Sequence, residues 1–268
     1  MVTGSLGDVA SPFEIVCEIE PATRPDLTRV RHQIGVLGTV TSSFLIPDNH
    51  IGRATVSSIA VANEVDRMGG RAVACVNARD RNLLGFRRDL LTAAAYGVDD
   101  FLFVYGDDPS TGHRTGQLTV RSMLEELRTF AATPGLDGRT LSAGVTTRLA
   151  PLPAWKAQAD ALYTQVTYSI DDLARWRDTV EFDGPIYAGV MVLASPAHAR
   201  KLAATVPQLA APDRWADALD RDPSAGIELA CEHLLAIRDH GGFAGAHLVP
   251  VGTYRQTAAH LEQLLRDG

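Results

Sequence analysis

A carboxylate follows a glycine at the end of a strongly apolar run. Residues 101–105 are Phe-Leu-Phe-Val-Tyr, a pattern typical of a buried strand, and Gly106 and Asp107 come directly after them. The glycine leaves the backbone free of a side chain there, and the aspartate beside it can hold or move a proton. Because parallel α/β proteins keep their sites at the carboxyl ends of their strands, we expect the chemistry of this chain at that point.

Other predicted strands also lead into polar side chains. Glu18 stands in the alternating segment 13–20, and Gln165 lies in the apolar segment 161–167. The polar residues that follow the predicted strands 39–46 and 72–76 are Asp48, Asn49, Asn77, Arg79, Asp80 and Asn82. Taken singly, Asp48 and Asn49 suit a turn and Asn82 suits a helix cap.

The alternating segment 13–20 allows two interpretations. Glu14, Glu18 and Glu20 would share one face of this strand. Carboxylates on an inward face cost several kcal/mol unless they are paired or needed for function. An edge strand with a solvated face explains the pattern equally well.

Eight predicted strands alternate with helices along the chain. We expect the strands at residues 13–20, 39–46, 72–76, 101–105, 141–146, 161–167, 186–193 and 244–251. We expect helical segments at residues 26–37, 56–68, 118–130, 153–160, 171–180, 195–205, 226–239 and 257–265. Another helix carries Leu83, Phe86, Leu90 and Ala94 at helical spacing, and Gly97 is placed to end it.

This alternation is typical of an α/β fold built as a single closed (β/α)8 TIM-type barrel. We expect the barrel domain at residues 13–268, after a flexible tail at residues 1–12. Extra helical material at residues 212–220, near the C-terminal end, would lie over one end of the barrel. On this fold one face of the barrel would collect the following polar residues: Glu18, Asp48, Asn49, Asn77, Arg79, Tyr105, Asp107 and Gln165.

Composition excludes several classes of function. The formal net charge is -7 and no basic run occurs, so nucleic acid is not an expected partner. No apolar run is long enough to cross a bilayer and residues 1–12 lack a signal-peptide pattern, so we expect no membrane partner and a cytoplasmic protein. A homo-oligomer is left open.

Cysteines and histidines give no metal motif. Cys17, Cys75 and Cys231 are widely spaced and form no CxxC, which favours buried thiols. The eight histidines show no HxH or HExxH spacing, so no metal site is expected. His233 and His240 are expected at the surface, and His247 is expected to be a packed histidine with a backbone partner.

Six groups of residues occur in a fixed order. They are Glu18-Ile19-Glu20-Pro21; Pro47-Asp48-Asn49 with Gly52-Arg53; Arg79-Asp80-Arg81-Asn82 with Asp89-Leu90-Leu91; Gly106-Asp107-x-Pro109; Ala157-Gln158-Ala159-Asp160 with Thr164-Gln165; and Gly226-Ile227-Glu228-Leu229-Ala230 with Gly245-Ala246-His247-Leu248. In this order they resemble the methylenetetrahydrofolate reductase family, over nearly the whole chain from Glu14.

The resemblance implies a barrel in which NADH or NADPH reduces FAD, and the flavin passes hydride to methylenetetrahydrofolate, or the reverse. Glu18 matches the family's acid, which protonates N10 of the folate and opens its five-membered ring, and Asp107 matches an acid near the flavin and the pterin. The residues implied to bind substrate are Gln165, Asp48 and Asn49. The residues implied to bind cofactor are Asn77, Arg79, Asp80, Tyr105, Gly106 and Lys156.

The chain departs from the family pattern at several places. Cys75-Val76-Asn77 stands where the family often has His-Leu-Thr, and residues 144–147 replace Tyr-Pro-Glu-x-His. No GxGxxG or GxxxxGK[ST] motif occurs, so neither a Rossmann site nor a P-loop is supported. Three hypotheses follow: a FAD-dependent reductase, a flavin-free enzyme in which nicotinamide meets the folate directly, and a non-catalytic folate- or flavin-binding relative.

Overall fold

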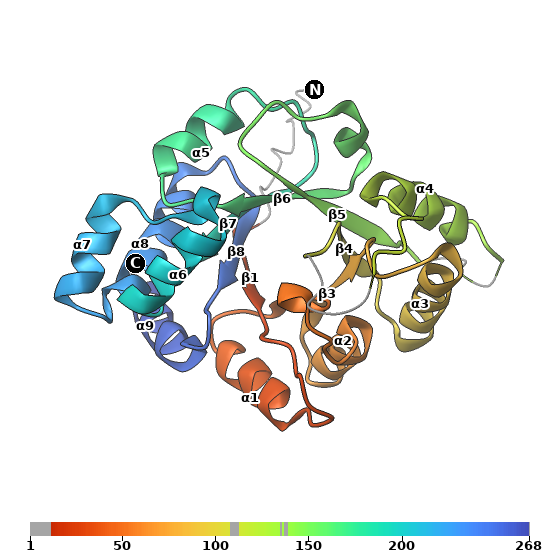
Figure 1. Cartoon of the computed structure of the whole chain (residues 1–268), viewed down its shortest axis with the longest axis horizontal. Helices are drawn as coiled ribbons and strands as arrows, with labels where there is room; N and C mark the ends of the chain where they lie inside the picture. Colours follow the sequence, from red (N-terminus) through yellow and green to blue (C-terminus); the bar gives the residue numbers. More distant parts are fainter. Residues whose placement is uncertain (1–11, 108–112, 135, 137–138, 268) are drawn as a thin grey trace, which may run out of the picture.

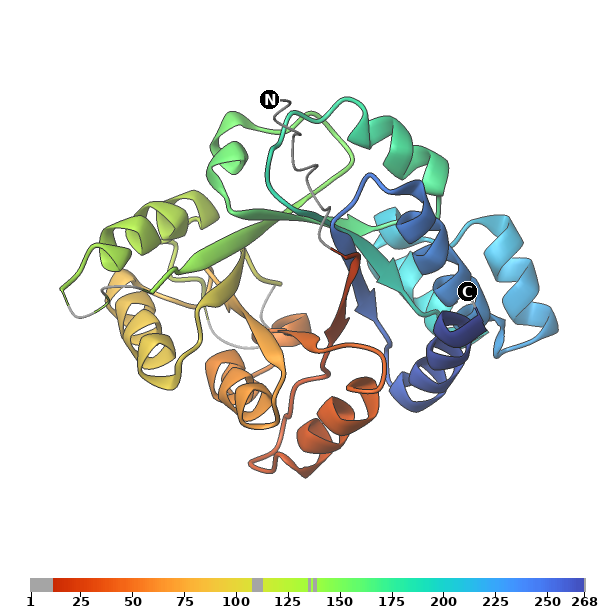
Figure 2. The same ribbon diagram turned by 180° about the vertical axis from the view of Figure 1, so that it is seen from behind.

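Eight parallel strands close into a barrel, and helices surround it (Figures 1 and 2). A computed structural model of the chain describes residues 12–107, 113–134, 136 and 139–267. The strands are β1 (Glu14–Glu18), β2 (Ser43–Ile46), β3 (Arg71–Asn77), β4 (Asp100–Val104), β5 (Ser142–Thr147), β6 (Ala161–Val166), β7 (Ile186–Met191) and β8 (Gly245–Val249). The predicted (β/α)8 fold is confirmed. Apart from Pro12, the predicted tail lies outside the described residues.

Helices connect successive strands on the outside of the barrel. They are α1 (Thr28–Leu37), α2 (Ser58–Arg67), α3 (Leu83–Tyr96), α4 (Val120–Ala131), α5 (Ile170–Arg177), α6 (Pro196–Thr205), α7 (Asp213–Arg221), α8 (Ala225–His240) and α9 (Tyr254–Asp267). Short 3-10 helices are η1 (His50–Gly52), η2 (Ala154–Gln158) and η3 (Pro207–Leu209). The extra helical material expected between the last two strands is present as α7. It packs beside α6 and α8 on the outside of the barrel rather than over one end, as had been expected (Figure 1).

Strand β1 closes the barrel and is not an edge strand. Val16 pairs with Ser43 of β2 on one side and with His247 of β8 on the other. Both sides of β1 are therefore in parallel ladders, and the edge-strand interpretation of the glutamate pattern is wrong.

The start, the end and the buried face of α3 are where the local sequence predicts them. The Asn82 side chain accepts a hydrogen bond from the Gly85 N–H and so caps the helix N-terminus. Gly97 ends the helix with φ of 78°, a left-handed conformation that glycine adopts without a side-chain clash. Phe86 and Leu90 are buried against the barrel, as their spacing predicts.

Side chains pack in two layers, one inside the barrel and one between the barrel and its helices. The inner layer includes Val16, Leu45, Val73, Cys75, Leu102 and Tyr163. The outer layer is larger and includes the three phenylalanines of β2 and β4 (Phe44, Phe101 and Phe103). This alternation of inward and outward side chains along each strand holds the strand ends, and the polar loops that follow them, in fixed positions.

The three glutamates near β1 have different surroundings. Glu14 lies at the amino-terminal floor of the barrel, where it pairs with Arg71 at 2.8 Å and accepts a hydrogen bond from the Tyr187 hydroxyl at 2.6 Å. Burial would raise the pKa of Glu14, but hydrogen bonds from Ser43 and Tyr187 and the charge of Arg71 lower it overall. Glu18 lies at the opposite end, and Glu20 follows the strand, is exposed and pairs with Arg29.

Several predicted boundaries and positions need correction. The strand predicted at 39–46 begins only at Ser43, because residues 39–41 turn back onto the end of α1. Residues 154–158 form a 3-10 helix and α9 begins at Tyr254.

His233 is buried rather than at the surface. The three cysteines are buried free thiols, as predicted. Across the described part of the chain, we find no helix with the length and apolar character needed to cross a membrane.

Candidate active site

A cavity of about 490 Å³ lies at the carboxyl-terminal mouth of the barrel; we call it the mouth cavity. The predicted site residues that line it are Glu18, Asp48, Tyr105, Gly106, Asp107 and Gln165. They come from β1, β6 and the loops after β2 and β4, so strand closure brings together residues that are far apart in the sequence. These six residues lie at one mouth of the barrel, whereas Asn49, Asn77 and Arg79, which were expected with them, do not line the cavity.

Glu18 contacts a histidine from the neighbouring strand. Its Oε2 lies 3.2 Å from Nε2 of His247, and the two side chains are 16% and 13% exposed. The Nε2 of His247 makes no well-aligned hydrogen bond to any described atom, so its contact with Glu18 is a close approach of the two groups. The pair therefore joins two groups that can exchange a proton, at the wall of the mouth cavity.

The Gly106-Asp107 pair is positioned by the loop after β2. Gly106 has φ of 99°, and a Cβ there would lie 2.9 Å from Cβ of Asn77, so this tight turn requires glycine. Asp107 is exposed, and its Oδ2 accepts a hydrogen bond from the Ile51 N–H at 2.9 Å. Ile51 itself is left-handed, with φ of 55°. Asp107 therefore anchors a strained loop and leaves its second oxygen beside the cavity.

Asp48 is the centre of a buried hydrogen-bond network. Its side chain is only 4% exposed, and Oδ2 accepts from the backbone N–H of Asn77 at 2.9 Å and from Asn77 Nδ2 at 2.7 Å. Arg81 also donates to Asp48, and its Nε donates to Asp89 at 2.7 Å. The network fixes the ends of β2 and β3 relative to each other, so the Asp48 carboxylate that borders the cavity already has three donors.

Four of the predicted cofactor or substrate residues turn away from the mouth cavity. Asn77 is fully buried in the Asp48 network, and Arg79 is 2% exposed and pairs with Asp80 at 3.0 Å. Asn49 donates to Asp80 at 3.0 Å. Burial would raise the pKa of Asp80, but hydrogen bonds from Arg79 and Asn49 lower it overall. These side chains bind one another, and none of them lines the cavity.

Lys156 also lies outside the lining of the mouth cavity. Its Nζ donates to the backbone oxygen of Thr146 at 2.7 Å. Burial and the nearby charge of Arg148 lower the pKa of Lys156. The lysine is therefore close to the end of β5, but its ammonium group is directed to the backbone.

The mouth cavity contains residues that the sequence did not single out. They are His50, Cys75, Thr146 and Arg148, with His247 placed in an unexpected contact. Burial and the nearby carboxylates of Glu18 and Asp48 raise the pKa of Cys75 well above its ordinary value, so the thiol is a neutral part of the wall. Arg148 directly follows β5 and residues 144–147, the segment that departs from the family pattern. This position was the only signal in the sequence that could have pointed to Arg148.

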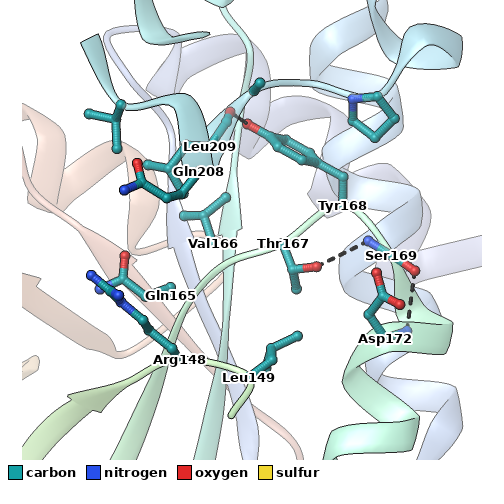
Figure 3. A pocket seen from close by; sticks show the side chains of 13 residues that line it. Arg148, Leu149, Gln165, Val166, Thr167, Tyr168, Ser169, Asp172, Gln208 and Leu209 are labelled. Carbon is teal, nitrogen blue, oxygen red and sulfur yellow. Dashed lines mark hydrogen bonds between the residues drawn. The ribbon is translucent and has the colours of Figure 1, made fainter.

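A second cavity of about 450 Å³ lies beside the first; we call it the side cavity (Figure 3). Its walls come from the loop after β6, the first turn of α5 and the segment around η3, residues 206–212. Arg148 and Gln165 line both cavities. In Figure 3 the Arg148 side chain lies beside that of Gln165, and Asp172 lies toward the opposite end near Ser169.

Comparisons with known proteins show the fold. No family model and no curated protein matches the sequence. An uncharacterized protein from Clostridium thermocellum that binds two copies of 5-methyl-5,6,7,8-tetrahydrofolic acid is similar in structure, with a TM-score of 0.64, 12% identity and coverage of 96% of both chains. The EDTA monooxygenase EmoA from Chelativorans sp. BNC1 is similar with a TM-score of 0.54 and 8% identity, over 96% of this chain and 94% of that one.

The spore cortex-lytic enzyme SleL of Bacillus cereus has a TM-score of 0.57 and 12% identity, over 94% of this chain and 74% of that one. One barrel architecture thus serves a folate-binding protein, a monooxygenase and a lytic enzyme. Function must therefore be argued from the residues of the site.

Proposed function

We propose that the chain is an oxidoreductase that transfers hydride between a reduced nicotinamide and a one-carbon derivative of tetrahydrofolate. The observation that supports this best is the Glu18–His247 pair, placed in one cavity with Gln165 and Asp107. A largely buried carboxylate at a barrel mouth, as Glu18 is, suits acid chemistry better than simple binding. The folate-binding barrel of similar structure supports the substrate class.

Glu18 supplies the acid that this reaction needs. In the forward direction a proton moves from the Glu18 carboxyl to N10 of methylenetetrahydrofolate, and the bond between N10 and the methylene carbon breaks. The positive charge is left on the iminium formed at N5. A reduced nicotinamide bound in the same cavity would supply the hydride that converts the methylene carbon into the 5-methyl group. His247 lies where it can return a proton to Glu18.

Gln165 and Asp107 are assigned to binding of the pterin ring. Gln165 is exposed to the cavity and its amide can both donate and accept, which matches the mixed donor and acceptor edge of a pterin. The free oxygen of Asp107 can accept from ring N–H or amino groups. Three donors hold the Asp48 carboxylate through its Oδ2 and tie it to β3 and Arg81, so we give Asp48 a positioning role.

The residues implied to hold FAD do not fit that role here. Of the six, only Tyr105 and Gly106 line the mouth cavity, while Asn77, Arg79 and Asp80 bind their own neighbours. This favours the flavin-free hypothesis, with direct transfer from NADH or NADPH to the folate. A FAD-dependent enzyme is the alternative, and the visible absorption spectrum of the purified protein separates the two.

The test is Glu18→Gln, compared with Glu20→Gln as a matched control on an exposed residue outside the cavity. We expect the first variant to lower the rate of NAD(P)H oxidation with methylenetetrahydrofolate by about 10²- to 10⁴-fold, the usual worth of a general acid. Binding of 5-methyltetrahydrofolate should change little, because glutamine keeps the shape of the side chain. Full activity in Glu18→Gln would overturn the assignment of the acid, and a wild-type protein with no folate turnover and no folate binding would overturn the function.

A further inference from the structure

The mouth cavity and the side cavity meet at two shared residues, Arg148 and Gln165. A ligand whose ring occupies the mouth can therefore extend past these residues into the side cavity. The side cavity offers apolar contacts from Leu149, Val206 and Leu209. Such a surface suits an aromatic or aliphatic linker better than a second strongly polar ring.

Charge is distributed unequally between the two cavities. The mouth cavity carries the carboxylates of Glu18, Asp48 and Asp107. Arg148 at the junction is exposed, and none of the described acidic side chains forms an ion pair with it. An anionic group on a ligand is therefore repelled from the mouth and attracted to the junction.

The far end of the side cavity is also unfavourable for an anionic group. Asp172 lies there, close to the start of α5 and away from Arg148 in Figure 3, and it pairs with Arg175. The side chains of Gln165 and Gln208 line the same side of the cavity as Arg148 in Figure 3. An acid on the ligand thus finds the Arg148 cation and the Gln165 amide at the junction, the Gln208 amide in the side cavity, and the paired Asp172 carboxylate at the far end.

We propose that the side cavity and Arg148 bind the acidic tail of an elongated ligand whose ring lies in the mouth cavity. The chemical class is a reduced pterin joined through an aromatic linker to an amino acid with free carboxylates, as in glutamate conjugates of tetrahydrofolate. The linker packs on Leu149 and Leu209, and a tail carboxylate accepts hydrogen bonds from Arg148. The identity of the ring rests on the proposed function, whereas the place of the anion rests on the charges of the two cavities.

The experiment compares 5-methyltetrahydrofolate with a 5-methyltetrahydropterin that lacks the aminobenzoylglutamate tail. Dissociation constants are measured by titration calorimetry on the full chain for the wild type, Arg148→Gln and the control Arg121→Gln, an exposed arginine of α4 paired with Glu125. We expect Arg148→Gln to weaken folate binding by about tenfold and to leave pterin binding unchanged. Arg121→Gln should change neither constant.

A second variant tests the cavity without removing a charge. Ala210→Phe fills part of the side cavity and leaves the residues of the mouth cavity intact, so folate binding should weaken while pterin binding is kept. Folate binding to the wild type should also weaken as salt is added, and more steeply than binding to Arg148→Gln. We expect one folate molecule per chain, because a single molecule spans both cavities.

Four results would overturn the proposal. The first is equal affinity of the wild type and Arg148→Gln for the folate, and the second is an equal loss of affinity for folate and pterin in Arg148→Gln. The third is two folate molecules bound per wild-type chain. The fourth is a higher KM for NAD(P)H in Arg148→Gln with an unchanged KM for the folate. The last result would assign Arg148 to the phosphates of the nucleotide. A wild-type chain that binds neither ligand contradicts the proposed function itself, and that pattern differs from all four.

Discussion

The buried Asp48 network gives the sharpest stability prediction. We expect Asp48→Ala to destabilise the barrel because three donors lose their shared acceptor. The N–H and Nδ2 groups of Asn77 would each cost about 1–2 kcal/mol when left buried without an acceptor. Arg81 keeps Asp89 and a backbone carbonyl as partners, so its share is about 1 kcal/mol. The expected total is about 4 kcal/mol.

The assay is urea unfolding at pH 7.5, followed by circular dichroism. Thermal unfolding gives an independent measurement. For a chain of this size, a loss of about 4 kcal/mol in the free energy of unfolding lowers the melting temperature by roughly 10 °C. Asp107→Ala is the matched control, because this aspartate also borders the mouth cavity but is exposed and accepts a single described hydrogen bond from the chain. A loss below about 1 kcal/mol for Asp48→Ala, together with weaker folate binding, would refute the positioning role and return Asp48 to the substrate site.

Two further predictions concern a loop and a buried histidine. Asp107→Ala should lower the free energy of unfolding by about 1 kcal/mol and should speed proteolytic cleavage near Ile51, because the strained loop loses the hydrogen bond to Asp107. An unchanged rate of cleavage would show that the loop keeps its conformation without this hydrogen bond. Burial lowers the pKa of His233 from 6.5 to about 4, with the positive charge of Arg214 in the same direction and a hydrogen bond with the Thr167 backbone opposing it. The unfolded chain therefore takes up this proton first as the pH falls, so stability should drop by about 2 kcal/mol between pH 7.5 and pH 5. His233→Phe should remove that part of the pH dependence of the urea midpoint, and an unchanged slope would contradict the assignment.

The order and type of the secondary structure could be predicted from sequence because those features are local. Apolar spacing in α3, the Asn82 cap and the Gly97 terminus all depend on residues within one or two turns, and all three are found where they were expected. The boundaries that moved, at the start of β2 and of α9, depend on how neighbouring turns pack.

The position of β1 could not be decided in the same way. Its glutamates fit an edge strand and an inner strand equally well until the pairing of Val16 with His247 is known, a contact between the two ends of the chain. Arg71, Ser43 and Tyr187, which accommodate Glu14, also come from three other strands. Closure of the barrel supplied these partners.

The candidate site was also predictable from the sequence only in part. Sequence alone placed the polar residues at the carboxyl ends of the strands, since that follows from strand order and direction. It could not say that Asp48 and Asn77 bind each other, that Glu18 meets His247, or that Arg148 joins two cavities. Those facts depend on side-chain directions and on distances across the barrel, which only packing of all eight strands fixes.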